Sequence, residues 1–582
     1  MAMRGENFRF WLPVAGLMIF AVYSGIKLVR SHVTPEVSAP DYYFTRNISG
    51  RRGAVYSANG KGYPFVKSVP YWEYRLDPVA LTNAVVKRRG EPPRPKAAIV
   101  KTIADALSLD YRRLMQMCDN SKNRYQFLAR SSNTEAHRIL ADSKLVAGVS
   151  IEDRQVRQYL HGRMLSHVLG SVNADNVGSA GVELRFNKAL SGTPGIVRGM
   201  KDARGRELYD KRIVSVDPIP GADIYLTIDH NLQYEAEESL KWGLNEYGAA
   251  QGWCIVMDAR SAAVLAMASL PDFEPLAFGH TPDDAKINRA VAFNYEPGSV
   301  MKVITAAAAI DAGIVKPTTL YNTSRDDSRY FKLPGDGSHK WDPYMSVKDA
   351  IVRSSNIVIG KLSWDLGPQK LWTYLKKFGF GEKTGIELPG EQYGIMWHWK
   401  KWDKATWSRA GIGQGVSVTA IQLASAYQTI ANDGLRMKPY IVDRIVKPDG
   451  SEEKFSPKPL GRAISAATAR TVREMMLGVA SPGGTARRAA IKGFSIAGKT
   501  GTAQKSVDGS YAPGLYRATF CGMIPAEEPR LLVLVTLDFE ACTRYHQGGN
   551  SAGPVFKRIT ESALRYLMIS PDRPEELEDQ AF

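Results

Sequence analysis

An uncharged apolar run close to the N-terminus is the feature that most limits how this chain can fold. No residue from 10 to 26 carries a charge, and as a helix this run would extend about 25 Å at roughly 1.5 Å per residue. A bilayer core is about 30 Å thick, so the run reaches the short limit of a membrane span. Phe8, Arg9 and Lys27 flank it and can extend toward the lipid headgroups. We therefore predict a transmembrane anchor at residues 10–28.

A cleaved signal peptide is the alternative interpretation of this run. Such a peptide needs small residues at a cleavage site close behind its apolar part. The nearest match is at residues 37–39, well downstream, and Pro40 follows it. Basic residues lie on both sides of the run, so the positive-inside rule does not fix its orientation. An uncleaved anchor is favoured.

Length and composition limit what the rest of the chain can be. A chain of 582 residues exceeds one compact domain, because domains usually have about 100–200 residues. Its 44% hydrophobic and 23% charged residues allow a normal core. The net charge of +17 would suit a polyanionic partner, but no zinc-finger or basic-zipper pattern accompanies it, and nucleic acid is not expected. Four cysteines exclude a disulfide scaffold and a Cys-rich metal site, and neither a metal nor a cofactor is expected.

The remaining chain divides into two predicted domains and a tail. Residues 30–245 mix short strand-like runs with Gly and Pro and contain no catalytic cluster, which indicates a scaffold or docking domain. A helix is predicted at residues 105–117 and an alternating strand at 224–229. The second domain is predicted at residues 249–568. Acidic residues without apolar periodicity predict a disordered tail at residues 569–582.

One motif points to nucleotide binding and needs testing first. Residues 493–500 match the phosphate-loop pattern G-x-x-x-x-G-K-[ST], and Asp538 ends an apolar strand as a magnesium ligand would. A phosphate loop must lead into a helix, but the following residues 501–514 carry three glycines and a proline. Residues 516–523 and 531–538 instead predict two antiparallel strands joined by a turn. An ATPase is therefore disfavoured.

A serine and a lysine on an apolar helix form the first catalytic candidate. After Gly298 the chain is rich in Ala, Val and Ile as far as Asp311, which predicts a buried helix. Ser299 and Lys302 lie three positions apart and so share one face. Burial lowers the pKa of a lysine, and a neutral amine can activate a serine nucleophile. The alternative is a helix-capping serine beside a lysine that extends to solvent.

Two further motifs follow in order along the chain. Residues 354–356 read Ser-Ser-Asn and enter an apolar helical run, and residues 499–502 read Lys-Thr-Gly-Thr and end a strand next to the predicted hairpin. Each pattern alone is weak, because similar ones occur at residues 131–133 and 383–385. The ordered set of three, on helix, helix and strand, is much more specific.

With these motifs the sequence resembles the penicillin-recognising serine transferases. It is more similar to class B penicillin-binding proteins, and residues 413–419 favour the septal (FtsI-type) D,D-transpeptidases over the elongation type. Further segments carry the resemblance, at residues 52–56, 178–183, 288–299, 497–504 and 548–556. Ser355 stands where class A β-lactamases have Asp, and no Glu-x-x-Leu-Asn loop is present, so no fast deacylating base is expected.

The resemblance implies an α+β fold with three parts. These are an N-terminal membrane helix, an elongated mixed pedestal domain of the dimerisation type at residues 30–245, and a transpeptidase domain at residues 249–568. The transpeptidase domain would have an antiparallel sheet flanked by helices, like the serine β-lactamases. Residues 1–9 would be a cytoplasmic tail, because the chemistry acts on the wall outside the inner membrane.

The resemblance also implies roles for the motif residues. Ser299 would attack the penultimate D-Ala of a stem peptide and Lys302 would accept its proton, although the base is disputed in this superfamily. Ser354 would relay a proton, Asn356 would hold the stem amide, and Lys499 would add positive potential. Thr500, Gly501 and Thr502 would bind the terminal carboxylate, and the N–H groups of Ser299 and Thr502 would form the oxyanion hole.

The implied partners follow from this chemistry. They are stem peptides, with a D-Ala-D-Ala donor and an amine acceptor, together with β-lactams and a polytopic glycosyltransferase and other division proteins that bind the pedestal and membrane helix. The protein would cross the inner membrane once, with its catalytic domain in the periplasm. An elongation role, and a non-catalytic scaffold or β-lactam sensor on the same fold, stay open as alternatives.

Overall fold

The computed structural model describes most of the chain outside the N-terminal region. The described residues are 17–24, 43–78, 81, 95–119, 126–141, 148–201, 207–337, 339, 341–507, 510–541 and 546–578. Residues 17–24 are helical, and the rest of the predicted anchor and the predicted tail at 1–9 lie outside the described residues. Within the described ranges no helix combines the length and the apolar character needed to cross a membrane.

The chain forms two compact units, and the first is small. It comprises Met1–Arg51 and Gly192–Pro220. Its described part is a three-stranded antiparallel sheet in the order β1-β6-β7. The strands are β1 (Tyr43–Ile48), β6 (Gly195–Lys201) and β7 (Glu207–Val216). The predicted pedestal at residues 30–245 is therefore divided between the two units.

The second unit comprises Arg52–Ser191 and Gly221–Phe582 and contains a seven-stranded sheet in the order β15-β14-β8-β2-β3-β4, with β5 also paired to β3. These strands are β2 (Val55–Tyr56), β3 (Pro64–Leu76), β4 (Gln126–Ser131), β5 (Val149–Tyr159), β8 (Asp223–Leu226), β14 (Val442–Val446) and β15 (Glu452–Lys454). Because β14 pairs with β8, one sheet joins residues of the predicted pedestal to residues of the predicted catalytic domain.

Three helices bury their apolar sides in a separate small core beside β3, β4 and β5. They are α3 (Lys96–Leu107), α4 (Tyr111–Asp119) and α5 (Thr134–Ala141). The single helix predicted at residues 105–117 is wrong, because Ser108 adopts a left-handed conformation with φ of 55° and ends α3. The chain then restarts as α4.

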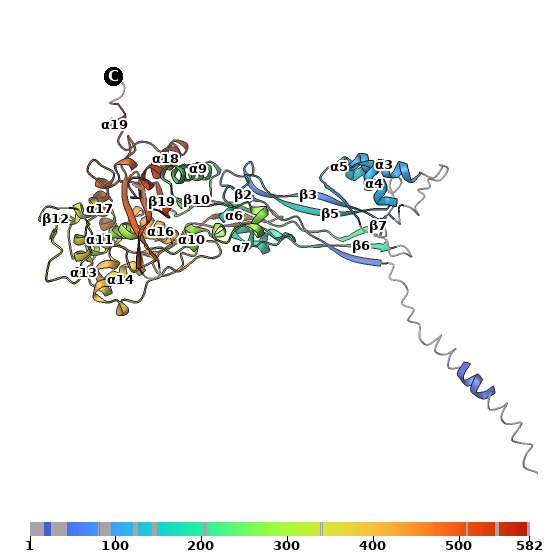
Figure 1. Ribbon diagram of the computed structural model, residues 1–582, viewed down its shortest axis with the longest axis horizontal. Coiled ribbons are helices and arrows are strands. Elements are labelled where there is room, and N and C mark those ends of the chain that lie inside the picture. The colour runs from blue at the N-terminus through green and yellow to red at the C-terminus, as the bar shows by residue number, and fades with distance from the viewer. Residues whose placement is uncertain are drawn as a thin grey trace, which may run out of the picture. The chain divides into compact units, whose positions relative to one another are not determined.

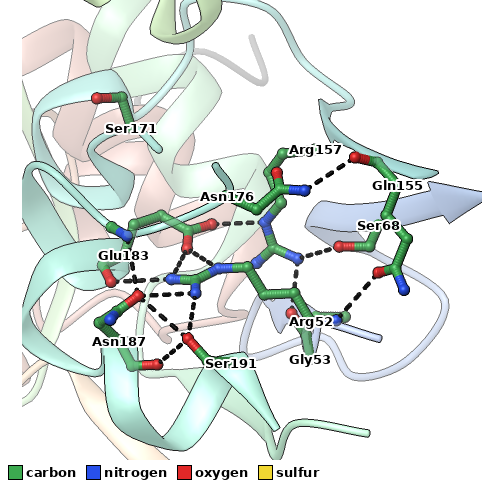
Figure 2. Close-up of polar contacts among 12 residues, drawn as sticks. Arg52, Gly53, Ser68, Gln155, Arg157, Ser171, Asn176, Glu183, Asn187 and Ser191 are labelled. Carbon is green, nitrogen blue, oxygen red and sulfur yellow. Dashed lines mark hydrogen bonds and ion pairs between the residues drawn. The ribbon is translucent and has the colours of Figure 1, made fainter. Parts of the chain in front are cut away.

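A buried ion cluster links the strands and short helices of the second unit (Figure 2). Glu183 in α7 (Gly181–Arg185) accepts hydrogen bonds from Arg52 Nε at 2.7 Å and from Arg157 Nε at 2.6 Å. All three side chains are almost completely buried. Arg52 also donates to Asn187 and Ser191 of α8 (Asn187–Ser191), and Arg157 donates to Gly53 O and Ser68. The cluster therefore ties segments that are far apart in the sequence. The remaining short helix nearby is α6 (Ser166–Leu169).

A five-stranded antiparallel sheet in the order β10-β9-β19-β18-β17 forms the centre of the predicted catalytic domain. The strands are β9 (Gln251–Asp258), β10 (Val264–Leu270), β17 (Ala497–Val507), β18 (Ser510–Ile524) and β19 (Leu531–Phe539). Every residue of β19 is buried, so both faces of the sheet are covered. The antiparallel hairpin predicted from the sequence is confirmed by the pairing of β18 with β19.

Helices cover this sheet. α9 (His230–Tyr247) and α18 (Ala552–Tyr566), far apart in the sequence, lie side by side against it, and α16 (Ala420–Ala431) also packs on it (Figure 1). The other helices are α10 (Arg289–Ala292), α11 (Met301–Asp311), α12 (Val347–Val352), α13 (Asn356–Leu366), α14 (Pro368–Lys377), α15 (Lys404–Ala410) and α17 (Ala466–Met476). Two small strand pairs complete the region, namely β11 (Leu320–Asn322) with β12 (Tyr344–Ser346) and β13 (Leu435–Met437) with β16 (Pro459–Arg462).

The acidic C-terminal segment is ordered where the structure describes it. Asp572 accepts hydrogen bonds from the backbone N–H of Ser495, at 2.8 Å, and from its hydroxyl. Arg573 N donates to Gly493 O at 3.1 Å, and α19 (Glu575–Glu578) follows. The predicted disorder at residues 569–582 is therefore wrong as far as residue 578, because its polar groups have partners that sequence composition does not reveal. The last four residues lie outside the described part.

Candidate active site

Ser299 lies in a tight turn at the start of α11. The turn Gly298–Val300 is a single 3₁₀ turn that continues directly into the helix. Gly298 has a φ of +60°, and its N–H donates to Gly413 O at 3.1 Å. Gly413 is itself left-handed, and a Cβ there would lie 2.3 Å from Gly298 O. Two glycines in close backbone contact therefore fix the position of the candidate nucleophile.

Lys302 lies in the first turn of α11 and is completely buried. Its Nζ lies 2.5 Å from Ser354 O and 3.1 Å from Ser354 Oγ. Burial lowers its pKa from 10.5 to about 7, and the negative charge of Asp336 limits that decrease. A substantial share of Lys302 is therefore neutral near pH 7, as a proton acceptor requires. Among the described hydrogen bonds none joins Lys302 to Ser299.

Ser354 joins the second motif to two lysines. It has a φ of +63°, which is uncommon for a residue other than glycine and often marks a functional site. Its hydroxyl lies 3.0 Å from Lys499 Nζ as well as 3.1 Å from Lys302 Nζ. The next residue, Ser355, caps α13 by accepting from Val358 N at 3.2 Å. The cap turns the chain so that Ser354 faces both lysines.

Lys499 lies on β17, opposite Cys521 of β18, and is completely buried. Its Nζ also lies 3.1 Å from Thr500 O. Burial, and then the positive charge of Lys302, lower the pKa of Lys499 well below 10.5. Two ammonium groups that share one hydroxyl repel each other, so a charge on either lysine disfavours a charge on the other. Lys499 provides the predicted positive potential only when it is protonated, and a bound anion beside it favours that protonated form.

These residues meet at a pocket of about 260 Å³. Five predicted site residues line it, namely Ser299, Ser354, Asn356, Thr500 and Thr502. The two lysines are not among the lining residues, but each contacts Ser354, which is. Gly501 does not line the pocket. A Cβ on Gly501 would lie 3.2 Å from Pro297 O and 3.2 Å from Val300. This glycine therefore lets β17 pack closely on the turn Gly298–Val300, which carries the candidate nucleophile and is called the nucleophile turn below.

The threonines of β17 are held by neighbours that the sequence analysis missed. Thr500 Oγ1 lies 2.9 Å from Thr485 Oγ1. Thr502 Oγ1 accepts from Gly548 N at 3.2 Å. A Cβ at Gly548 would lie 2.4 Å from Gly501 O, so only glycine allows this approach. The pocket residues that the sequence analysis did not assign to the site are Asp336, His339, Trp341, Arg353, Thr485, His546, Gln547, Gly548 and Gly549.

Asp336 is the most connected of the missed residues. Its carboxylate accepts from Asn356 N, from Ser355 Oγ at 2.7 Å and from Trp341 Nε1 at 2.7 Å. Asn356 Nδ2 donates in turn to Gly335 O at 2.7 Å. Asp336 therefore holds the second motif in place from a separate loop. A Gly-Asp-Gly run reads only as a turn in the sequence, so no local signal identified it.

The two sequence decoys take no part in this pocket. The phosphate-loop match ends inside β17, where its lysine is part of a strand that runs on to Val507, so no helix follows it and the ATPase interpretation is wrong. At the second Lys-Thr-Gly, Thr384 N and Oγ1 both donate to the buried carboxylate of Glu391. That segment is a loop held by the carboxylate of Glu391.

Two family descriptions match the chain over most of its length. Residues 252–561 match the penicillin binding protein transpeptidase domain. Residues 47–226 match the penicillin-binding protein dimerisation domain. The first match covers more than half of the chain and contains all three motifs.

Named relatives agree with these matches. Peptidoglycan D,D-transpeptidase FtsI of Escherichia coli is 31% identical over 540 residues, which are 90% of this chain and 85% of FtsI. Penicillin-binding protein PbpB of Mycolicibacterium smegmatis is 32% identical over 465 residues, which are 78% of this chain and 71% of PbpB. A structure of penicillin binding protein 3 from Mycobacterium tuberculosis in complex with aztreonam is similar with a TM-score of 0.68 and 27% identity, covering 91% of this chain and 99% of that one.

Proposed function

This chain belongs to the class B penicillin-binding proteins and is a peptidoglycan D,D-transpeptidase, and from that premise we propose how its own residues carry out the reaction. The observation that carries the proposal is the position of Ser354. Its hydroxyl lies within hydrogen-bond distance of both buried lysines, at the edge of the pocket that Ser299 also lines.

The first step is acylation of Ser299. Its Oγ attacks the carbonyl carbon of the penultimate D-Ala, and neutral Lys302 accepts the hydroxyl proton. The developing oxyanion is stabilised by the N–H groups of Ser299 and Thr502, and losing one such donor typically costs about 10²–10³ in rate. The lowered pKa of Lys302 supports its role as the acceptor.

The leaving D-Ala must gain a proton before it departs. Ser354 delivers that proton from Lys302 to the amine nitrogen, because its hydroxyl contacts Lys302 and lines the pocket. The terminal carboxylate binds at Thr500 and Thr502, and its negative charge raises the pKa of Lys499, so that this lysine becomes the counter-ion. Asn356 holds the stem amide after exchanging its contact with Gly335 O.

The acyl-enzyme is resolved by an amine on a second stem peptide. That amine attacks the ester carbonyl and gives up a proton to neutral Lys302. The bond to Ser299 Oγ then breaks, and Lys302 passes the proton to the serine. The product is a cross-link between two stems. A β-lactam acylates Ser299 in the same way as the stem peptide. Its acyl-enzyme then persists, because the sequence has no Glu-x-x-Leu-Asn loop to supply a base that activates water.

We assign this activity to septal wall synthesis at the inner membrane. The similarity to FtsI over 90% of the chain supports a division role. The apolar run at residues 10–26 supports a single membrane anchor, with residues 1–9 in the cytoplasm and the catalytic region in the periplasm. Division proteins, among them a polytopic glycosyltransferase, would bind the pedestal and the anchor. Septal enrichment of a fluorescent fusion in dividing cells is the expected result, and lateral labelling alone would contradict it.

Labelling with fluorescent penicillin tests the catalytic assignment. Wild type should be labelled covalently and Ser299→Ala should not. Ser451→Ala is the matched control, because Ser451 has the same spacing to a lysine, Lys454, as Ser299 has to Lys302. It should be labelled like wild type. Equal labelling of wild type and Ser299→Ala would show that another residue is acylated.

A further inference from the structure

Exposed aromatic and apolar side chains gather on one short segment of the catalytic region. Tyr393, Ile395 and Trp397 are 59%, 49% and 60% exposed. The intervening Met396 packs inward against Gly381. Three large apolar side chains exposed within five positions are unusual for a surface segment and indicate a binding surface. We call Tyr393, Ile395 and Trp397 the aromatic strip.

Lysines accompany the strip. Lys383 Nζ lies 4.9 Å from the centre of the Tyr393 ring, and Lys401 Nζ lies 5.0 Å from the centre of the Trp397 ring. Neither lysine forms an ion pair with any acidic residue that the structure describes. The strip therefore offers aromatic faces with positive charge beside them. A ligand with flat apolar faces and negative groups would match both.

The backbone of the strip is held firmly although its side chains are exposed. Buried Gln422 donates to Tyr393 O at 2.8 Å. Ile395 exchanges backbone hydrogen bonds with Ser417, at 2.7 and 2.9 Å. Trp402 Nε1 donates to Trp397 O at 3.0 Å. Rings on a fixed backbone lose little conformational entropy when they bind, which is a property of binding sites.

The strip is linked directly to the nucleophile turn. Its partner Ser417 closely follows Gly413, whose carbonyl accepts from Gly298 N. In the same segment, Gly415 N donates to Glu296 at 2.7 Å, three residues before Ser299. The strip and the pocket are therefore positioned by the same segment. Because residues 413–417 contact both, they hold the strip in a fixed position relative to the turn that carries Ser299.

We propose that the aromatic strip, with Lys383 and Lys401, binds the glycan strand of the peptidoglycan substrate while a stem peptide occupies the pocket. Sugar rings present flat C–H faces that stack on Trp397 and Tyr393. The stem peptides that branch from the strand carry free carboxylates, and these pair with the lysines. This inference rests on the transpeptidase activity but not on the assignment of any catalytic residue, since the strip lies outside the pocket lining.

Binding of stem-free glycan to the full-length protein tests the strip. The probe is a set of amidase-treated strands of alternating N-acetylglucosamine and N-acetylmuramic acid. Removing the stems frees the lactyl carboxylates, which stand in for the carboxylates of the stems. Trp397→Ala and Tyr393→Ala should each weaken binding by about tenfold. Lys401→Glu should also weaken binding, and its effect should be larger at low salt than at high salt. Tyr234→Ala on α9 is the matched control, because Tyr234 is a tyrosine exposed to a similar extent, at 53%; it should bind like wild type.

Penicillin acylation and vesicle binding distinguish the outcomes. All four variants should be acylated at the wild-type rate, which shows that the pocket is intact. The proposal is overturned if wild type does not bind the strands or if Trp397→Ala binds them equally well. Vesicles containing anionic phospholipid should not bind through the strip. Vesicle binding that Trp397→Ala abolishes, without strand binding, would instead make the strip a membrane surface. If wild type binds the strands but is not acylated by penicillin, the catalytic proposal is contradicted and the proposal for the strip is not.

Discussion

At the scale of single residues, the site is built around two buried lysines that share one hydroxyl. A charged lysine is expensive to bury, and a neutral one is much less so. Lys302 and Lys499 are both completely buried, and both contact Ser354. The fold therefore leaves a substantial share of Lys302 neutral near pH 7, three positions after the serine that we propose as the nucleophile.

Acylation should depend on pH through Lys302. Its pKa is about 7, so below that pH it is protonated and cannot accept a proton. The acylation rate constant should fall about tenfold per pH unit below the pKa and level off above it. Measuring fluorescent penicillin acylation from about pH 5 to about pH 9 checks this, with circular dichroism to confirm that the fold persists. A flat profile would exclude Lys302 as the base.

Replacing Asp336 should move that profile. The carboxylate raises the pKa of Lys302, so Asp336→Asn should shift the midpoint of the pH profile below pH 7. It should also slow acylation at high pH, because the contacts to Ser355 and Asn356 weaken. Asp342→Asn is the control, because Asp342 is an exposed aspartate just beyond the same loop. An unchanged midpoint in Asp336→Asn would show that its charge does not act on Lys302.

At the scale of elements, close contacts between distant segments decide where the motifs lie. β17 approaches the turn Gly298–Val300 closely at Gly501, and the backbone of Gly413 is in close contact with Gly298. α13 begins at a serine cap and at a carboxylate from another loop. The two helices and the strand that carry the motifs each form from local sequence. Their relative positions depend on close glycine contacts, which a larger residue would prevent, and on helix caps.

The ion cluster of Figure 2 should be a main source of stability for the segments that it joins. Glu183→Gln leaves Arg52 and Arg157 buried with a neutral partner, which should lower the free energy of unfolding by about 3–5 kcal/mol. Glu152→Gln is the control on β5, because Glu152 pairs with Arg154 at the surface and should change stability by under about 1 kcal/mol. Thermal unfolding measures both. If Glu183→Gln melts at the same temperature as wild type, Glu183 has no structural role.

At the scale of the whole molecule, the net charge of +17 and the apolar run bear on location. A basic protein surface suits anionic lipid and wall polymers with carboxylates, and an enzyme exported as we propose would not meet nucleic acid. The full-length chain should sediment with membranes and resist extraction by high salt, whereas a chain lacking residues 1–28 should be soluble. Fractionation followed by immunoblotting measures this. Release of the full-length chain by salt alone would exclude an integral anchor.

The sequence alone determined the order of the three motifs, the buried helix after Ser299 and the antiparallel hairpin. These follow from local patterns, namely apolar periodicity, caps and turn residues, which act over a few positions. The break at Ser108 and the ordered segment after residue 568 were not predicted, because composition and periodicity do not record the backbone of one residue or the partners of a polar segment.

Only the tertiary structure decided how the site is assembled. Ser354 reaches Lys302 across 52 positions and Lys499 across 145, and Asp336 caps a helix from a loop 20 positions away. Thr485 and Gly548 join the pocket in the same way. Such contacts, and the desolvation that lowers the pKa of both lysines, exist only once distant segments pack together and exclude water. The sequence therefore identifies the chemistry, and the packing sets the positions and the protonation of the groups that perform it.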